Sequence, residues 1–132
     1  MRKVMRYEGV MPFEYAPELG LHAPAKIPVR PGEKAKLSVE LYGPAKNPVF
    51  TFKRYFGLGK TVCAFNTEIG KDERLVCRDG RTWKVEVCAN GKVLREGTLE
   101  KQLPLLKGTS TFTFAAEVPQ GQSCSVDLLK TY

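Results

Sequence analysis

RTWKVEVCANGKVLRE, residues 81–96, contains the single tryptophan of the chain and its clearest turn signal. Trp83, Val85 and Val87 alternate with polar residues, which is the two-residue period of a strand with one buried face. An Asn-Gly pair follows at 90–91, and these two residue types readily take the positive φ angles of a type I′ turn. The stretch therefore predicts a β-hairpin whose apolar side chains anchor the core.

The register of this hairpin follows from counting outward from a two-residue turn. Val87 then pairs with Leu94, and Glu86 pairs with Arg95. These pairs supply one apolar contact and one opposite-charge contact across the two strands. No catalytic or binding chemistry follows from these residues, so the hairpin is predicted to be a scaffold element.

Further strands are predicted on both sides of the hairpin. Alternating, β-branched or aromatic residues mark the segments 35–41, 49–56, 61–66, 74–77, 110–118 and 124–128. Gly, Pro, Asn or Asp residues separate them, and no long helix is indicated. The pattern predicts an all-β fold, a single Greek-key β-sandwich that is immunoglobulin-like in the broad sense, with seven to nine short strands.

Two intervening segments are less regular. Residues 67–74 are polar and charged, so we expect a solvated loop there. Leu99, Leu103 and Leu106 have the spacing of one helical turn, but Pro104 argues against a longer helix.

Residues 1–33 contain five of the nine prolines of the chain. Proline at this density disfavours helix interiors and central strands. We therefore expect an extended N-terminal arm that packs on its own domain or on a neighbouring subunit, followed by a sandwich domain at 34–132. Tyr7, Phe13 and Tyr15 are the candidate partner contacts of the arm.

The positive charge of the chain is regional. The 132 residues include 21 Lys and Arg against 14 Asp and Glu, a net charge of +7, and residues 26–60 alone hold eight Lys or Arg and two Glu. If the apolar residues of 35–41 face the core, the lysines between them point outward. The candidate partner-binding residues of this predicted basic face are Lys34, Lys36, Tyr42, Lys46, Lys53, Tyr55 and Lys60.

Metal binding and catalysis find little support in the sequence. The four cysteines, Cys63, Cys77, Cys88 and Cys124, include no Cys-x-x-Cys pair, and His22 is the single histidine. Free thiols and two disulfides in any of three pairings both remain open. We expect no metal, no cofactor and no enzymatic activity.

One short segment resembles a phosphate-binding loop but lacks its first glycine. Residues 57–61, GLGKT, resemble the end of that motif, but Arg54 stands where its first glycine is required. The residues that follow favour a strand over the helix that must face the phosphate. The segment is interpreted as a hairpin loop.

The first 17 residues lack the apolar run of a secretory signal, and no segment has 18 consecutive apolar residues. We expect a soluble protein that is cytoplasmic or associated with a virion or another assembly.

Several stretches carry a family resemblance. Pro31-Gly32, the strand 37–41, Leu103-Pro104-Leu105 and the strand 112–119 resemble the MD-2-related lipid-recognition domains, which are secreted β-sandwiches that hold lipid between their sheets. The resemblance implies a lipid carrier. Such a carrier requires a cavity, for which Phe50, Phe52, Phe112 and Phe114 are the expected lining residues.

The favoured hypothesis is a non-enzymatic structural or interaction module that joins a larger complex, such as a virion or a surface layer, through its arm and its basic face. Protein subunits with acidic surfaces, among them further copies of the chain, are the expected partners. A lipid carrier and a binder of anionic polymers are the alternatives, and nucleic acid is disfavoured because no recognised nucleic-acid-binding motif accompanies the charge.

Overall fold

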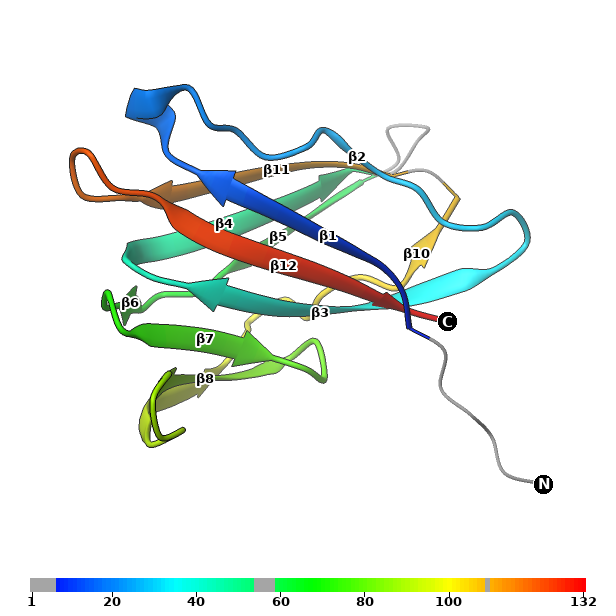
Figure 1. The fold of residues 1–132 in the computed structure, drawn as a ribbon. Coiled ribbons are helices and arrows are strands. Elements are labelled where there is room, and N and C mark those ends of the chain that lie inside the picture. The colour runs from blue at the N-terminus through cyan, green and yellow to red at the C-terminus, as the bar shows by residue number, and fades with distance from the viewer. Residues whose placement is uncertain (1–6, 54–58, 109) are drawn as a thin grey trace.

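The computed structural model describes residues 7–53, 59–108 and 110–132, with side chains described from residue 12 onward. In these residues the chain is all-β and forms two antiparallel sheets that face each other (Figure 1). One 3-10 turn, η1 (Pro17–Leu19), accompanies the strands. The prediction of an all-β, sandwich-like chain is confirmed.

The large sheet has the strand order β1-β12-β3-β7-β8-β9, and β10 also pairs with β3. Its strands are β1 (Tyr7–Tyr15), β3 (Lys34–Tyr42), β7 (Glu73–Cys77), β8 (Thr82–Val87), β9 (Val93–Thr98), β10 (Leu106–Lys107) and β12 (Cys124–Thr131). The small sheet has the order β2-β11-β4-β5, and β6 also pairs with β4. Its strands are β2 (Lys26–Ile27), β4 (Ala45–Lys53), β5 (Lys60–Ala64), β6 (Glu68–Ile69) and β11 (Ser110–Glu117).

Nine of these strands have five or more residues, and β2, β6 and β10 have two each. The eight strands predicted from their patterns correspond to the longer ones other than β1, which lies in the region expected to be an extended arm. A short strand piece was expected at 26–29, where β2 lies, whereas β6 and β10 are too short to show an alternating pattern.

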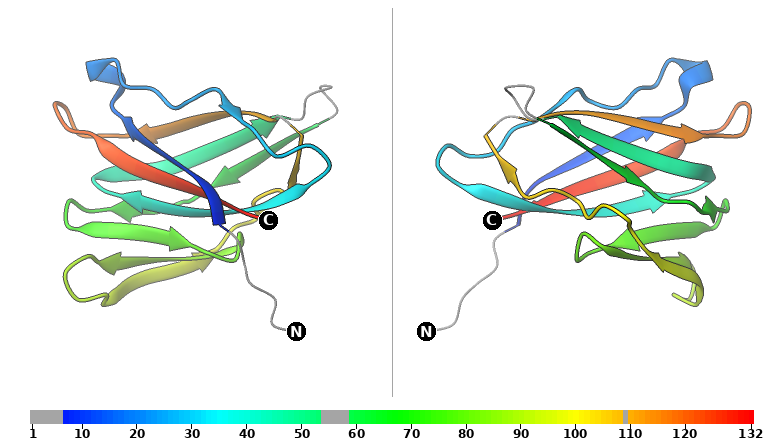
Figure 2. Two further views of the ribbon diagram at one scale, coloured as in Figure 1. Left: turned by 45° about the vertical axis from the view of Figure 1, so that its right-hand side comes forward. Right: turned by 180° about the vertical axis from the view of Figure 1, so that it is seen from behind.

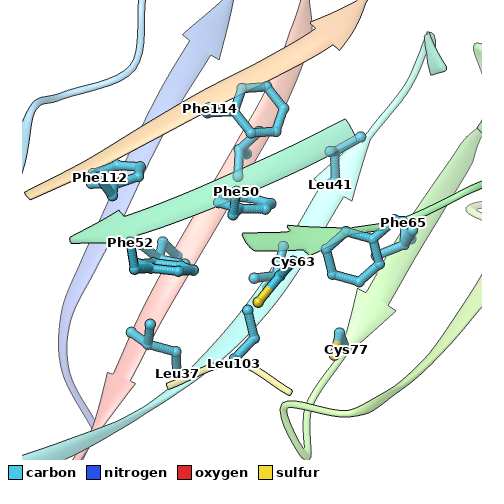
Figure 3. Close-up of a cluster of buried hydrophobic side chains, with 14 of the residues drawn as sticks. Leu37, Leu41, Phe50, Phe52, Cys63, Phe65, Cys77, Leu103, Phe112 and Phe114 are labelled. Carbon is cyan, nitrogen blue, oxygen red and sulfur yellow. The ribbon is translucent and has the colours of Figure 1, made fainter. Parts of the chain in front are cut away.

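The core lies between the two sheets. In β3 every second residue is buried from Ala35 to Leu41, and in β12 every second residue from Cys124 to Lys130. Within this layer Phe50 and Phe52 of β4 lie beside their partners on the neighbouring strand β11, Phe114 and Phe112 (Figure 3). The inward faces predicted for these strands are confirmed.

The hairpin of residues 81–96 is present, but its place and register differ from the prediction. It forms the edge of the large sheet, with β7 between it and β3 (Figure 1). Val85 pairs with Arg95 and Glu86 pairs with Val93, so the predicted pairs of Glu86 with Arg95 and of Val87 with Leu94 are wrong. The hairpin closes one margin of the core instead of forming its centre.

A longer turn causes this change of register. The N–H of Val87 donates to the carbonyl of Lys92 at 2.9 Å, and the side-chain oxygen of Asn90 accepts the N–H of Lys92 at 2.9 Å. Gly91 has a φ of +70°, but Asn90 is not among the residues with positive φ, so the turn is not type I′. The asparagine acts through its side chain, which caps the turn.

The two irregular segments are more ordered than predicted. Ile69 of β6 is 1% exposed and pairs with Ala45, so 67–74 is not wholly a solvated loop. Leu99, Leu103 and Leu106 are buried without a helix, and the carbonyl of Gln102 accepts the thiol of Cys63 on β5. The segment between β9 and β10 therefore contributes apolar side chains to the core.

Residues 7–15 of the proline-rich region form an edge strand of nine residues. β1 pairs along its length with β12, and the register shifts between Glu8 and Val10. Pro12 is tolerated because an edge strand has one row of backbone groups outside the ladder. Figure 2 shows β1 lying on the sandwich of its own chain. The division into an arm and a domain stays a prediction.

Candidate functional site

The aromatic side chains predicted as contacts of the arm are directed inward where the structure describes them. Tyr15 is 9% exposed and meets the ring of Phe114 edge-on, with 4.9 Å between the ring centroids. Phe13 is half-buried and lies 5.6 Å from Phe114, centroid to centroid. Both side chains therefore pack into the core of their own chain. The side chain of Tyr7 lies outside the described residues.

The residues of the predicted basic face do not share one face. Lys34 and Lys36 point outward from β3 of the large sheet, whereas Lys53 and Lys60 point outward from the small sheet. The physical reason is that β3 and β4 do not pair, because the chain crosses from one sheet to the other between them. Tyr55 lies outside the described residues.

Tyr42 and Lys46, which also belong to the predicted basic face, lie at the strand ends away from the other lysines. Tyr42 ends β3, where its hydroxyl donates to Glu40 at 3.2 Å, and burial followed by the nearby Glu40 charge raises the pKa of the phenol. Lys46 lies near the start of β4, paired with Glu117 on one side and Glu68 on the other. Neither residue joins the other lysines.

Pairing across the small sheet gathers three lysines in one row. Lys26 of β2 pairs with Thr111 of β11, Thr111 also pairs with Lys53 of β4, and Lys53 pairs with Lys60 of β5. Adjacent strands are about 4.8 Å apart, so this row spans roughly 14 Å. Three lysines from distant parts of the sequence thus form one end of the outer face of the small sheet.

The large sheet carries a matching group at the same end of the sandwich. Lys107 of β10 pairs directly with Lys34 of β3, and Lys36 lies two residues along the same outer face. Two residues separate Lys107 from Ser110, where β11 of the small sheet begins. The two groups therefore flank one end, at which β2 and β10 lie in Figure 1.

We name this end the basic end and define it by six lysines. They are Lys26, Lys34, Lys36, Lys53, Lys60 and Lys107. All six side chains are exposed, and within the described part of the chain none of them forms an ion pair with a carboxylate. Like charges directly opposite each other destabilise a sheet. The pairs Lys53–Lys60 and Lys34–Lys107 are therefore placed at a cost to folding.

The C-terminal strand holds the loop that leads into this end. The ammonium group of Lys130, a buried residue, donates to the carbonyl of Pro28 at 2.6 Å. The guanidinium of Arg30 lies 4.1 Å from the ring centre of Tyr132 and 3.0 Å from the carboxylate of Glu33. These contacts fix the backbone just before β3 and so position its first lysines.

Lys26 and Lys107 were not among the predicted site residues. Each lies in a two-residue strand, and its membership of the basic end depends on a pairing with a strand elsewhere in the sequence. Local sequence patterns carry no signal for such pairings. Charge alone was a weak indicator, since lysines are usually solvated.

A shallow depression of about 330 Å³ lies on the outer face of β7, β8 and β9. Arg78 and Lys84 line it together with Asp79 and Glu96. Asp79 accepts hydrogen bonds from the backbone and hydroxyl of Thr82, and the hydroxyl bond is the main cause that lowers the pKa of this carboxyl. Asp79 therefore holds the turn between β7 and β8.

The four cysteines are free thiols, which decides between the alternatives left open by the sequence. Cys63, Cys77 and Cys124 are buried, and burial raises their pKa values to about 11, about 12 and about 11. A thiol is a poor nucleophile while it keeps its proton. Within the described residues, no group of three or more His, Cys, Asp or Glu side chains is arranged to hold a metal ion.

No protein-family model, curated protein or solved structure matches this chain. The resemblance to the MD-2-related lipid-recognition domains therefore gains no support from these comparisons. Among the described residues, no helix is long and apolar enough to span a bilayer.

Proposed function

We propose that the protein is a non-enzymatic interaction module that joins a larger assembly by docking its basic end on an acidic surface of a partner protein. The observation that carries this proposal is the direct pairing of Lys53 with Lys60 and of Lys34 with Lys107. Two unneutralised pairs reduce the stability of the free chain, and an acidic partner would relieve both.

The shape of the basic end favours a macromolecular partner. Its lysines project from the outer faces of two different sheets instead of converging on a pocket. A small anion would contact one group of lysines, whereas a broad acidic surface can meet both. The long side chains add attraction and faster association more than shape recognition.

We also propose a Greek-key, immunoglobulin-like connectivity for the sandwich. A Greek-key, immunoglobulin-like arrangement is supported by connections that pass between the sheets, from β3 to β4 and from β11 to β12. The β3 to β4 connection also explains why the first lysines of the basic end are divided between the two sheets.

Binding to poly-L-glutamate tests the proposed function, because this polymer presents carboxylates as an acidic protein surface does. The double variant Lys34→Thr/Lys107→Thr is expected to bind about five- to tenfold more weakly, a loss of roughly 1 kcal/mol. Lys71→Thr/Lys92→Thr removes the same net charge from exposed positions outside the basic end and is the matched control.

The two variants separate a localised site from overall charge. Equal losses in both would contradict the proposal, because net charge alone would then explain binding. Strong binding of heparin or single-stranded DNA with none of poly-L-glutamate would favour the anionic-polymer alternative instead.

The lipid-carrier alternative is less favoured by the packing of the phenylalanines expected to line a cavity. Phe50 and Phe114 have ring centroids 4.8 Å apart, and Phe52 and Phe112 are 6.1 Å apart and stacked. All four side chains are at most 6% exposed. Rings of Phe13 and Tyr15 on the large sheet also contact Phe112 and Phe114, so side chains of the two sheets meet directly at this point, which counts against a lipid between them.

A further inference from the structure

The outer face of the small sheet has an uncharged centre between two charged rows. Pairing across β11, β4 and β5 places six small or aliphatic residues in two adjacent rows: Thr113, Thr51 and Val62, then Ala115, Val49 and Ala64. All six are exposed or half-buried, and Val62 is 40% exposed. We name these six residues the neutral belt.

The rows on either side of the neutral belt differ in charge. Beyond its first row lie Lys26, Lys53 and Lys60 of the basic end. Beyond its second row, Glu117, Lys46 and Glu68 pair across β11, β4 and β6. One margin of the face therefore carries three positive charges, and the other carries a net charge of −1.

From this distribution we infer that the outer face of the small sheet is a docking surface for a second copy of the same chain, stacked face to face with its strands reversed. A twofold axis that lies in the plane of the face and across the strands produces this arrangement. It sets Lys60 of each copy over Glu68 of the other and Glu117 between Lys26 and Lys53 of the other, whereas Lys46 comes to lie over Lys53. A row with a charge of +3 still meets a row with a net charge of −1. The inference does not depend on the proposed function.

The alternative twofold arrangement is disfavoured by charge. An axis parallel to the strands would set the lysine row of one copy over the lysine row of the other. Like charges held together at an interface cost free energy, so this orientation is selected against. In the reversed orientation the neutral belt meets itself, with Thr51 over Val49 and Val62 over Ala64, and the contact contains no buried charge at its centre.

The size of the face limits the strength of the contact. Four strands at about 4.8 Å and the seven residue steps from Lys46 to Lys53 give a face of roughly 24 by 14 Å. The area of such a face, roughly 340 Å² from strand spacing and rise per residue, is well below the roughly 800 Å² that each partner buries in a standard complex. We therefore expect a weak dimer with a dissociation constant in the micromolar range.

Sedimentation velocity of the whole chain, from about 5 to about 500 µM, brackets such a dissociation constant. Low salt is used first, because exposed charge pairs are largely screened at high ionic strength. A monomer–dimer equilibrium is expected. Thr51→Arg, which puts charge into the neutral belt, is expected to weaken dimerisation at least tenfold. Thr98→Arg, at an exposed position on β9 of the other sheet, is the matched control.

A charge exchange tests the orientation. Lys60→Glu and Glu68→Lys each place like charges opposite one another and are expected to weaken the dimer about three- to tenfold, roughly 1 kcal/mol. The double variant Lys60→Glu/Glu68→Lys restores opposite charges and is expected to recover dimerisation. If Thr51→Arg fails to fold, Ala115→Arg tests the same belt.

A chain that stays monomeric over the whole concentration range overturns the inference. So does a dimer that Thr51→Arg leaves unchanged, or single charge variants that the double variant does not rescue. Lys34 and Lys107 lie on the large sheet, so Lys34→Thr/Lys107→Thr is expected to leave the dimer intact. The same variant is expected to weaken binding of poly-L-glutamate, so the two proposals can fail independently.

Discussion

Lys53 and Lys60 lie directly opposite each other on β4 and β5, at the edge of the small sheet. Directly opposed residues of an antiparallel pair have Cα atoms about 4.5–5.5 Å apart, so the two positive charges repel each other. A sequence under selection for stability alone has no reason to keep this pair. Residues kept at a cost to folding are expected where they serve binding.

Lys60→Glu is therefore expected to stabilise the isolated chain by about 0.2–1 kcal/mol, because an opposite-charge pair replaces a like-charge pair. Urea unfolding at low salt, at a concentration where the wild-type chain is monomeric, measures this as a rise in the unfolding midpoint. The gain should shrink in high salt. Lys92→Glu, at an exposed hairpin position, is the control, and a lower midpoint for Lys60→Glu than for this control would contradict the argument.

The indole of Trp83 covers Gly97 on the neighbouring strand. A Cβ atom added at Gly97 would lie 2.5 Å from Cζ2 of the ring, which is closer than real contacts allow. Gly97→Ala is expected to displace the indole and to cost about 1–3 kcal/mol. Because Trp83 is the single tryptophan, its emission reports the displacement directly. An unchanged emission maximum and midpoint, equal to those of Thr98→Ala, would show that the ring does not rest on the glycine.

Phe50 lies at the centre of the ring cluster and is 0% exposed. Phe50→Ala is expected to lower the free energy of unfolding by about 3–5 kcal/mol, since it removes buried apolar surface and leaves a cavity. Val62→Ala, an exposed position on the neighbouring strand, is expected to cost under about 0.5 kcal/mol. If a lipid occupied this layer instead, Phe50→Ala would be tolerated and fatty acids would raise the melting temperature of the wild type. Neither result is expected.

The buried thiols make stability fall at alkaline pH. Cys63, Cys77 and Cys124 keep their protons in the folded chain up to a pKa of about 11, about 12 and about 11, whereas an unfolded thiol titrates near 9. The unfolded chain then binds fewer protons than the folded one, so stability is fully present below pH 9 and is lost as the pH rises toward 11–12. Each thiol contributes about 1.4 kcal/mol per pH unit in this window.

Urea unfolding between about pH 8 and about pH 10.5, under reducing conditions, measures that slope. Cys77→Ala should reduce the slope by the share of one thiol, whereas Cys88→Ser should leave it unchanged because Cys88 is exposed. A slope identical in all three proteins would contradict the prediction.

The existence of the strands and the direction of their side chains followed from local patterns. Leu37, Val39 and Leu41 alternate with polar residues, and this alternation alone places them in the core. Patterns of this kind survive in any register, because the two faces of a strand are a property of its own backbone. The inward position of Phe50 and Phe52 was predictable for the same reason.

The candidate site was only partly predictable. Four of the six lysines of the basic end, Lys34, Lys36, Lys53 and Lys60, were expected on one basic face, and the structure divides them between two sheets. Consecutive strands commonly pair, so the sequence favoured a single sheet face. The crossing between β3 and β4 depends on the packing of the whole chain.

The hairpin of residues 81–96 shows the same limit. Its strands were evident from their period, but their register depended on whether Asn90 entered a tight turn or capped a longer one. The two alternatives differ in a few hydrogen bonds, and the neighbouring strand β7, which pairs with β8, contributes to the choice.

By itself, then, the sequence determined that the chain is all-β, which side chains of its regularly alternating strands enter the core, and that its positive charge is concentrated between residues 26 and 60. Tertiary structure alone decided that Lys26 and Lys107 join the others, that Lys53 faces Lys60, and that an uncharged belt separates two charged rows. The reason is physical. Periodicity is carried by neighbours in the chain, whereas strand pairing brings together residues that are distant in the sequence, and it is settled only when the whole core is buried.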